Sequence, residues 1–281
     1  MRLFRALALA GPAALLACAH AVRTAPDAER GSALAARVDA PRLLVEVLYT
    51  PADAAEAEDL RKLLLEAGPQ LSRWGSFRQG ITLRVLPDHE AFEAAANRRG
   101  YPWLRAWTFP DQVLLQSPRS WSAQPGPARD QDVLELLVHE LTHALMYQLM
   151  EPARGPVWSV EEPPAWFREG MASVTAGQEH LRLPREELAR WAAAHPDADL
   201  LHPSEELYRT CGGTVYAAAH RAFELLLATS GEGSVRDLLQ RISQGAPFSE
   251  AFLRATGRPL AQFENDVVRG GFAAPAQASV K

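Results

Sequence analysis

The feature that most constrains the fold of this 281-residue chain is His-Glu-x-x-His at residues 139–143, within a run of helical apolar spacing. Residues four apart on an α-helix share one face, so His139 and His143 can bind the same metal ion. Glu140 points to the side of that pair, where it can touch a metal-bound water without being a ligand. The leucines around the motif predict a buried helix over residues 130–150. The pattern therefore predicts a zinc site of the kind that hydrolases use.

A catalytic zinc ion needs three protein ligands and an open position for water. A histidine six residues after His143 would complete one known pattern, but Met146 and Leu149 occupy the positions that it requires. We therefore expect a carboxylate from a second helix. Glu169 is the best candidate, because it lies in the apolar segment 166–172 and a buried carboxylate needs a partner. The alternatives lie in loop-like segments and are Glu161, Glu162, Glu179 and His180.

The two motifs, His-Glu-Leu-Thr-His and Trp-Phe-Arg-Glu-Gly-Met-Ala, together resemble those of the gluzincin metallopeptidases, most closely the peptidase-MA-like group. The resemblance implies that His139, His143 and Glu169 hold one Zn²⁺ ion. It also implies that Glu140 is the general base and that the substrate is a peptide or protein. One departure is Val174, where the family often has an aromatic residue.

Candidates for stabilising the oxyanion lie further along the chain, where apolar spacing predicts a helix over residues 213–230. By the same resemblance, Tyr216 near the start of this helix donates its hydroxyl to the oxyanion of the tetrahedral intermediate. His220 lies one turn further and could reach the same cleft, although packing within the helix explains it nearly as well. Tyr208 and His202 are weaker candidates.

The N-terminus has the pattern of a targeting segment. Arg2 and Arg5 precede the apolar residues 7–16, a run too short to span a bilayer. The run ends in Leu-Leu-Ala-Cys, which resembles a bacterial lipobox and implies that Cys18 is lipidated. The protein would then be anchored to the membrane on the periplasmic side of the bacterial cell envelope; secretion as a soluble protein is the alternative. Cys211 is then the remaining cysteine, and we expect it to be a small buried hydrophobe.

We expect an α+β, zincin-like fold in which a small mixed β-sheet lobe with helices leads into the zinc-binding helix and an all-helical lobe follows. The expected segments are a signal peptide (1–17), a mostly unordered tether (18–40), a metallopeptidase domain (41–270) and a tail (271–281). Within the domain, residues 41–150 form the α/β lobe with the zinc helix and residues 151–270 form the helical lobe.

Two strand-like segments, 103–109 and 112–116, precede the zinc helix. If the sheet borders the active-site cleft, the last of these strands would be an exposed edge. An extended peptide could then add to residues 113–115 by backbone pairing.

The formal net charge of −5 and the lack of a basic aromatic patch argue against nucleic-acid binding. The Gly-x-Met-x-Asn signature of the aminopeptidase branch is missing before the zinc helix, which leaves an endopeptidase as the default. Two other functions stay open. One is a catalytically weak envelope lipoprotein that uses the zincin fold for binding or scaffolding, and the other is a zinc hydrolase with a non-peptide substrate.

Overall fold

The computed structural model describes residues 32–38, 43–121, 126–151 and 162–272. The predicted signal peptide, the lipidation of Cys18 and the end of the predicted tail lie outside these ranges. The described residues all belong to one compact unit. Among the described residues, none of the helices combines the length and the apolar character that a membrane span requires.

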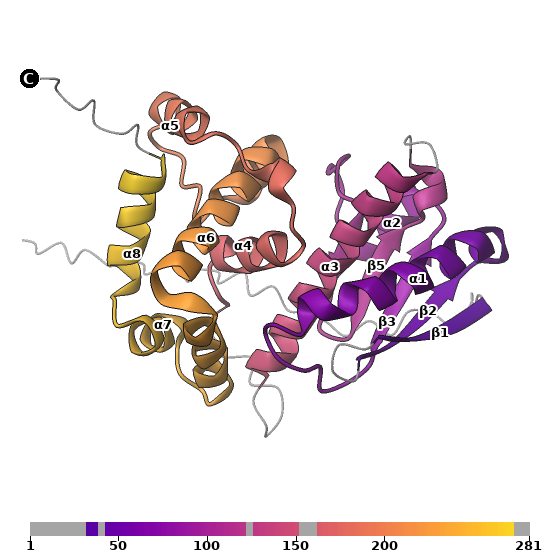
Figure 1. Ribbon diagram of the computed structural model, residues 1–281. Helices are drawn as coiled ribbons and strands as arrows, with labels where there is room; N and C mark the ends of the chain where they lie inside the picture. The colour runs from indigo at the N-terminus through magenta and orange to yellow at the C-terminus, as the bar shows by residue number, and fades with distance from the viewer. Residues whose placement is uncertain (1–31, 39–42, 122–125, 152–161, 273–281) are drawn as a thin grey trace, which may run out of the picture. The chain divides into compact units, whose positions relative to one another are not determined.

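A mixed five-stranded sheet forms the first part of the described chain (Figure 1). Its strands are β1 (Ser32–Val38), β2 (Leu43–Tyr49), β3 (Ile81–Leu86), β4 (Ala106–Thr108) and β5 (Gln112–Gln116). Their spatial order is β1-β2-β3-β5-β4. Strands β2, β3 and β5 are parallel, whereas β1 and β4 pair antiparallel with their neighbours.

The first strand corrects the prediction of an unordered tether over residues 18–40. Its part Ser32–Val38 is β1, which pairs with β2 from Ser32↔Tyr49 to Val38↔Leu43. The segment is rich in alanine, which has low strand propensity, so neither composition nor periodicity indicates a strand. The pairing with the open backbone edge of β2 is a tertiary interaction, and the sequence of the segment does not reveal it.

The prediction that residues 113–115 form a sheet edge is also wrong. Strand β5 lies between β3 and β4, and β4 is the outer strand. A two-residue loop explains this order, because Phe109 and Gln112 exchange backbone hydrogen bonds of 2.7 and 3.4 Å and close a hairpin. So short a loop makes β4 the antiparallel neighbour of β5. Residues 103–105, which the sequence also placed in this strand, precede it.

Helices cover both faces of the sheet. They are α1 (Ala54–Leu71) and α3 (Pro127–Met150) on one face and α2 (His89–Ala96) on the other. Side chains of β3 and β5 alternate accordingly: Leu83 and Val113 join the main core with α1 and α3, and Leu114 packs with Phe92 of α2. The metal-motif helix is therefore held against the sheet along one side, as Figure 1 shows.

The rest of the described chain is helical. Its elements are α4 (Ala165–Thr175), α5 (Arg185–Ala194), α6 (Glu205–Ser243), α7 (Phe248–Thr256), α8 (Leu260–Asp266) and a π-helix (Val267–Phe272). Three short 3-10 helices, Pro51–Asp53, Pro118–Ser120 and Glu179–Leu181, lie in the connections. The α+β, zincin-like fold class is thus confirmed.

Helix α6 begins before the helix that the sequence predicts over residues 213–230, and a kink lies where that predicted helix ends. It begins at Glu205 and continues to Ser243, with non-helical backbone at Cys211 and Gly231. Gly231 has φ = 76°, a conformation that glycine adopts without strain. The predicted end at residue 230 therefore coincides with the kink at Gly231. The first turns of α6 lie outside the predicted helix because the residues before Cys211 lack an apolar stripe.

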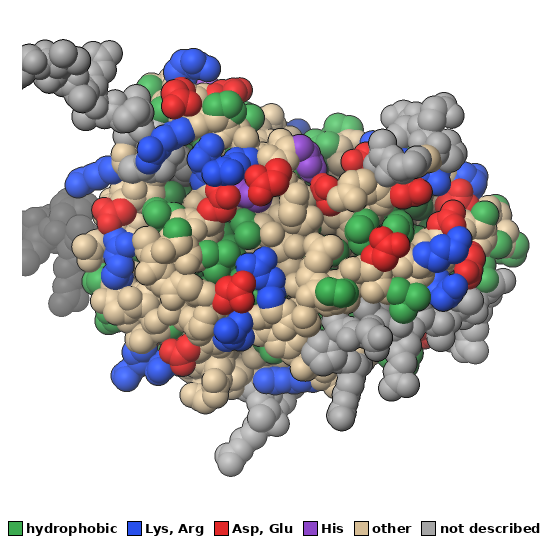
Figure 2. Space-filling view, in the orientation of Figure 1, with side chains coloured by type: hydrophobic (Ala, Val, Ile, Leu, Met, Phe, Trp, Pro, Cys, Tyr) green, Lys and Arg blue, Asp and Glu red, His purple; other side chains and the backbone are tan. Residues whose placement is uncertain are grey.

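Charged side chains of both signs are interspersed on the face shown in Figure 2. Among the described residues, some oppositely charged side chains pair along one helix, for example Arg254 with Glu250 on α7 and Arg241 with Asp237 on α6. Such exposed pairs contribute at most about 1 kcal/mol each. The stability of the fold therefore rests mainly on its apolar core.

Helices α4 and α6 pack against each other (Figure 1). They approach closely at Gly170 of α4. A Cβ atom at this position would lie 2.4 Å from the carbonyl oxygen of Ala219 and 2.6 Å from the Cβ atom of Phe223. Both distances are far inside van der Waals contact, so only glycine permits this spacing. The preceding residue, Glu169, is consequently held at a fixed position relative to α6.

Replacing Gly170 with Ala is expected to lower the free energy of unfolding by about 1–3 kcal/mol, because the new methyl group forces two backbones apart. Urea denaturation measures this. The control is Gly233→Ala on α6, where an added Cβ meets nothing within 4 Å. Alanine favours helices, so the control should be neutral or stabilising. A Gly170→Ala protein as stable as the control would contradict the close approach.

Candidate metal site and cleft

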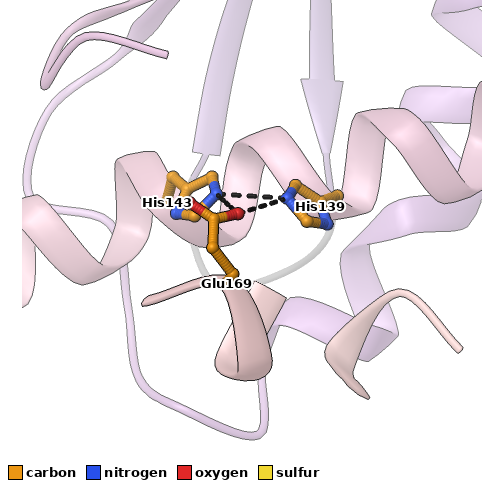
Figure 3. A group of neighbouring side chains, drawn as sticks. All are labelled: His139, His143 and Glu169. Atoms are coloured by element: carbon orange, nitrogen blue, oxygen red, sulfur yellow. Dashed lines mark hydrogen bonds and ion pairs between the residues drawn. The ribbon is translucent and has the colours of Figure 1, made fainter. Parts of the chain in front are cut away.

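Three predicted ligand side chains converge in the structure (Figure 3). The Nε2 atoms of His139 and His143, one turn apart on α3, lie 3.2 Å from each other. Glu169 extends from α4, and its Oε2 atom lies 3.4 Å from each of these nitrogens. All three side chains are largely buried. Two imidazole nitrogens and one carboxylate oxygen thus face a common point, which is a donor set that suits a divalent cation.

The alternative third ligands lie elsewhere. Glu162 is exposed and pairs with Arg168, and His180 pairs with Glu135. Glu179 belongs to a different cluster of side chains. Glu161 lies outside the described residues. Of the candidates that the structure describes, Glu169 is therefore the one that it brings to the two histidines.

The electrostatics of the group match this donor set. Burial alone would raise the pKa of Glu169, but the charge of His143 and hydrogen bonds with both histidines hold it well below its ordinary value. Burial alone would lower the pKa of His139, but the carboxylates of Glu169 and Glu140 raise it. Glu169 is therefore ionised, and a positive charge is favoured where the three side chains meet.

Gln178 orients the first histidine. It lies in the turn after α4, where no sequence pattern indicates this role. Its Oε1 atom lies 2.9 Å from Nδ1 of His139. An amide oxygen only accepts, so Nδ1 carries the hydrogen and Nε2 can direct its lone pair at a metal ion. His143 differs, because its Nδ1 atom is buried without a hydrogen-bond partner among the described residues.

Thr108 holds the carboxylate of Glu140, and the sequence did not indicate this contact either. Its hydroxyl donates to Oε2 of Glu140 over 2.6 Å and lies 3.1 Å from the backbone oxygen of the same residue. Thr108 is the last residue of β4, the outer strand of the sheet. The predicted general base is thus fixed to the sheet edge beside the metal ligands.

Two tyrosines lie next to the metal group. The ring of Tyr216 is centred 6.0 Å from the ring of His139 and 5.6 Å from that of Tyr208. Burial and the negative charge of Glu169 raise the pKa of both phenols well above 10.0. Both hydroxyls therefore stay protonated and can donate hydrogen bonds. Hydrogen bonds to Tyr216 and to Glu169 also raise the pKa of Tyr208, the weaker tyrosine candidate.

The two remaining histidine candidates have other partners. His220 is buried, with Nδ1 3.1 Å from Oγ of Ser173 and Nε2 3.8 Å from Oε1 of Glu224. Burial lowers the pKa of His220 to about 4, so its ring is neutral at pH 7. His202 lies at the surface, 3.0 Å from Glu264. The structure does not bring either of them to the His139–Glu169 group.

A cleft of about 920 Å³ opens beside this group. One wall is the segment 103–106, and another is the face of α3 that carries His139 and Glu140. The kinked start of α6, including Cys211 and Tyr216, lines it further. The cleft therefore gives a ligand access to both the predicted metal position and the predicted base.

Comparisons with known proteins agree with the fold. No protein-family model and no curated protein matches the sequence. The structure is similar to that of aminopeptidase A from Legionella pneumophila, solved with aspartic acid, with a TM-score of 0.52 and 14% identity over 86% of this chain and 28% of that chain. An M1 zinc metallopeptidase from Deinococcus radiodurans matches with a TM-score of 0.45 and 14% identity over 88% of this chain and 53% of that one.

The Legionella neighbour is an aminopeptidase, and the Deinococcus neighbour is a zinc metallopeptidase. This chain spans about a quarter of the Legionella structure and about half of the Deinococcus one. At such low identity, the likeness to the Legionella enzyme shows a shared fold. It does not by itself carry over an activity.

The buried His220 predicts a pH dependence of stability. The unfolded chain binds a proton at this residue near pH 6.5, but the folded chain does so only near pH 4. The free energy of unfolding should therefore fall as the pH drops from 6.5 to 4, by at most about 3 kcal/mol, and level off below. Urea denaturation of metal-free wild type and His220→Asn across this range tests it. Parallel profiles would contradict the prediction.

Proposed function

We propose that this protein is a zinc-dependent peptidase that hydrolyses peptide bonds with a metal-activated water. The observation that carries the proposal is the convergence of His139, His143 and Glu169 beside Glu140 in an open cleft. A zinc ion bound there would lower the pKa of a water molecule and polarise the scissile carbonyl. The shared fold with the Legionella aminopeptidase supports the same chemistry.

In this proposal Glu140 is the general base. Its carboxylate lines the cleft without joining the metal group, so it can take the proton of the attacking water and deliver it to the leaving amine. The hydrogen bond from Thr108 fixes which way the carboxylate points. The base is thus positioned before the substrate arrives.

We assign the oxyanion contact to Tyr216. Its ring lines the cleft beside His139, and its raised pKa keeps the hydroxyl a donor at neutral pH. We do not extend this role to His220, because the ring of His220 contacts Ser173 and Glu224 instead.

The proposed substrate is an extended peptide that pairs with the outer strand β4, whose residues 106–108 lead from the cleft wall to Glu140. The missing Gly-x-Met-x-Asn signature supports cleavage of internal bonds, in contrast to the aminopeptidases that share the fold. The lipobox-like sequence at Cys18 supports action in the bacterial cell envelope, with a lipid anchor in the membrane.

Replacing Glu140 with Gln should reduce peptide hydrolysis by about 100- to 10,000-fold, because an amide cannot take the proton of the water. Zinc content should stay at the wild-type level. The assay is digestion of a peptide library, with metal analysis of the same samples. The matched control is Glu135→Gln, which changes another cleft-lining carboxylate of α3.

Full activity of Glu140→Gln would refute this mechanism. Peptides blocked at both termini separate the two modes of cleavage, since only an endopeptidase cuts them. Zinc binding without turnover of any peptide would favour the alternative of a binding or scaffolding lipoprotein.

Replacing Gln178 with Ala should weaken zinc affinity by about 10- to 100-fold, because His139 loses the acceptor that sets its tautomer. Gln178→Glu keeps an acceptor and should retain the affinity. Competition with a chromophoric chelator measures both, with the exposed Gln244→Ala as the control. Equal affinities of the Ala variant and the wild type would show that Gln178 does not position the ligand.

A further inference from the structure

A second cluster of metal-binding side chains lies outside the site described above. Glu179, His220 and Glu224 each offer one ligand atom, and these atoms all lie within 4.8 Å of one another. His220 and Glu224 are one turn apart on α6, and Glu179 begins a short 3-10 helix after α4. His220 is buried and Glu179 is exposed, so the cluster is open to solvent on one side.

The hydrogen bonds of His220 fix the direction of its lone pair. The hydroxyl of Ser173 has one hydrogen, which it donates to the backbone oxygen of Gly170 over 3.3 Å. Its oxygen therefore accepts from Nδ1 of His220, 3.1 Å away. The neutral ring then carries its lone pair on Nε2, which faces Oε1 of Glu224 at 3.8 Å. A lone pair opposite a carboxylate is repulsive unless a cation lies between them.

This arrangement is the one that metal-binding histidines usually have. One ring nitrogen donates to an oxygen of the protein, and the other is left free to bind the ion. In the first site Gln178 accepts from His139 in the same way. Here Ser173 plays that part for His220.

One cation beside the cluster is the guanidinium of Arg182. It lies 3.3 Å from Glu224 and 3.5 Å from Glu179, and its side chain is 44% exposed. Long, exposed ion pairs of this kind contribute little. Arg182 can therefore turn into solvent when a divalent cation binds to the two carboxylates.

We propose that Glu179, His220 and Glu224 bind a second divalent cation. One imidazole and two carboxylates suit Zn²⁺ in particular. Because Glu179 follows Gln178, an ion at this position would tie the segment that orients His139 to helix α6. Occupancy of the second site should then tighten zinc binding at the first by several-fold. Only this coupling rests on the proposed function; the binding itself does not.

Zinc stoichiometry by equilibrium dialysis and metal analysis tests the proposal. We expect two ions per wild-type chain and one ion in each of the single variants Glu224→Gln and His139→Ala. The variant that combines these two substitutions should bind none. Glu179→Gln is a second probe at an exposed position, and circular dichroism checks that each variant is folded. The control is Glu206→Gln, an exposed carboxylate of α6 outside the cluster, which should keep two ions.

Arg182→Gln separates a metal site from a simple ion-pair network. Without the competing guanidinium, the second ion measured in the His139→Ala background should bind up to about fivefold more tightly. One ion in the wild type and none in His139→Ala would overturn the second site and leave the proposed peptidase intact. A stoichiometry of two ions per chain in both Glu224→Gln and Glu179→Gln would also overturn the second site. Loss of the first ion alone in His139→Ala supports both proposals.

Discussion

The close contact of α4 with α6 at Gly170 is the constraint on which the candidate site depends. Helix α3 supplies two histidines on one face by its periodicity alone. The carboxylate of Glu169 meets them because α4 packs so tightly against α6 that Gly170 has no room for a side chain. A metal site built from two helices needs this second helix to be fixed to within a fraction of an ångström, and backbone contact fixes it more firmly than side-chain packing would.

Much of this arrangement could be predicted because it is encoded locally. Regular apolar spacing predicts a helix over residues 130–150, which is most of α3, and helical periodicity places His139 and His143 one turn apart on it. Glu169 was predicted because a carboxylate among large apolar residues needs a partner. By contrast, Gln178 and Thr108 contact their partners across the fold, from a turn and from a three-residue strand with no motif. The pairing of β1 and the outer place of β4 are tertiary in the same sense.

Helix α6 links the features of the cleft with those of the second cluster. Tyr216, His220 and Glu224 follow one another at four-residue intervals, so they form one stripe along its surface. Tyr216 lies beside His139, whereas His220 and Glu224 form the second cluster together with Glu179. The sequence spacing therefore places His220 on the same face of α6 as Tyr216. Its distance along the helix decides that it meets Ser173 and Glu224 and not the cleft.

The three residues of strand β4 have two roles in the structure. Its outer side has no strand partner among the described residues. The hydroxyl of its last residue, Thr108, donates a hydrogen bond to Glu140. In the proposed peptidase, any displacement of this strand would be transmitted to the carboxylate that handles the proton. A ligand long enough to lie along β4 would stiffen that strand, whereas a dipeptide would leave it as it is. Selectivity for chain length would then show in the turnover rate as well as in binding.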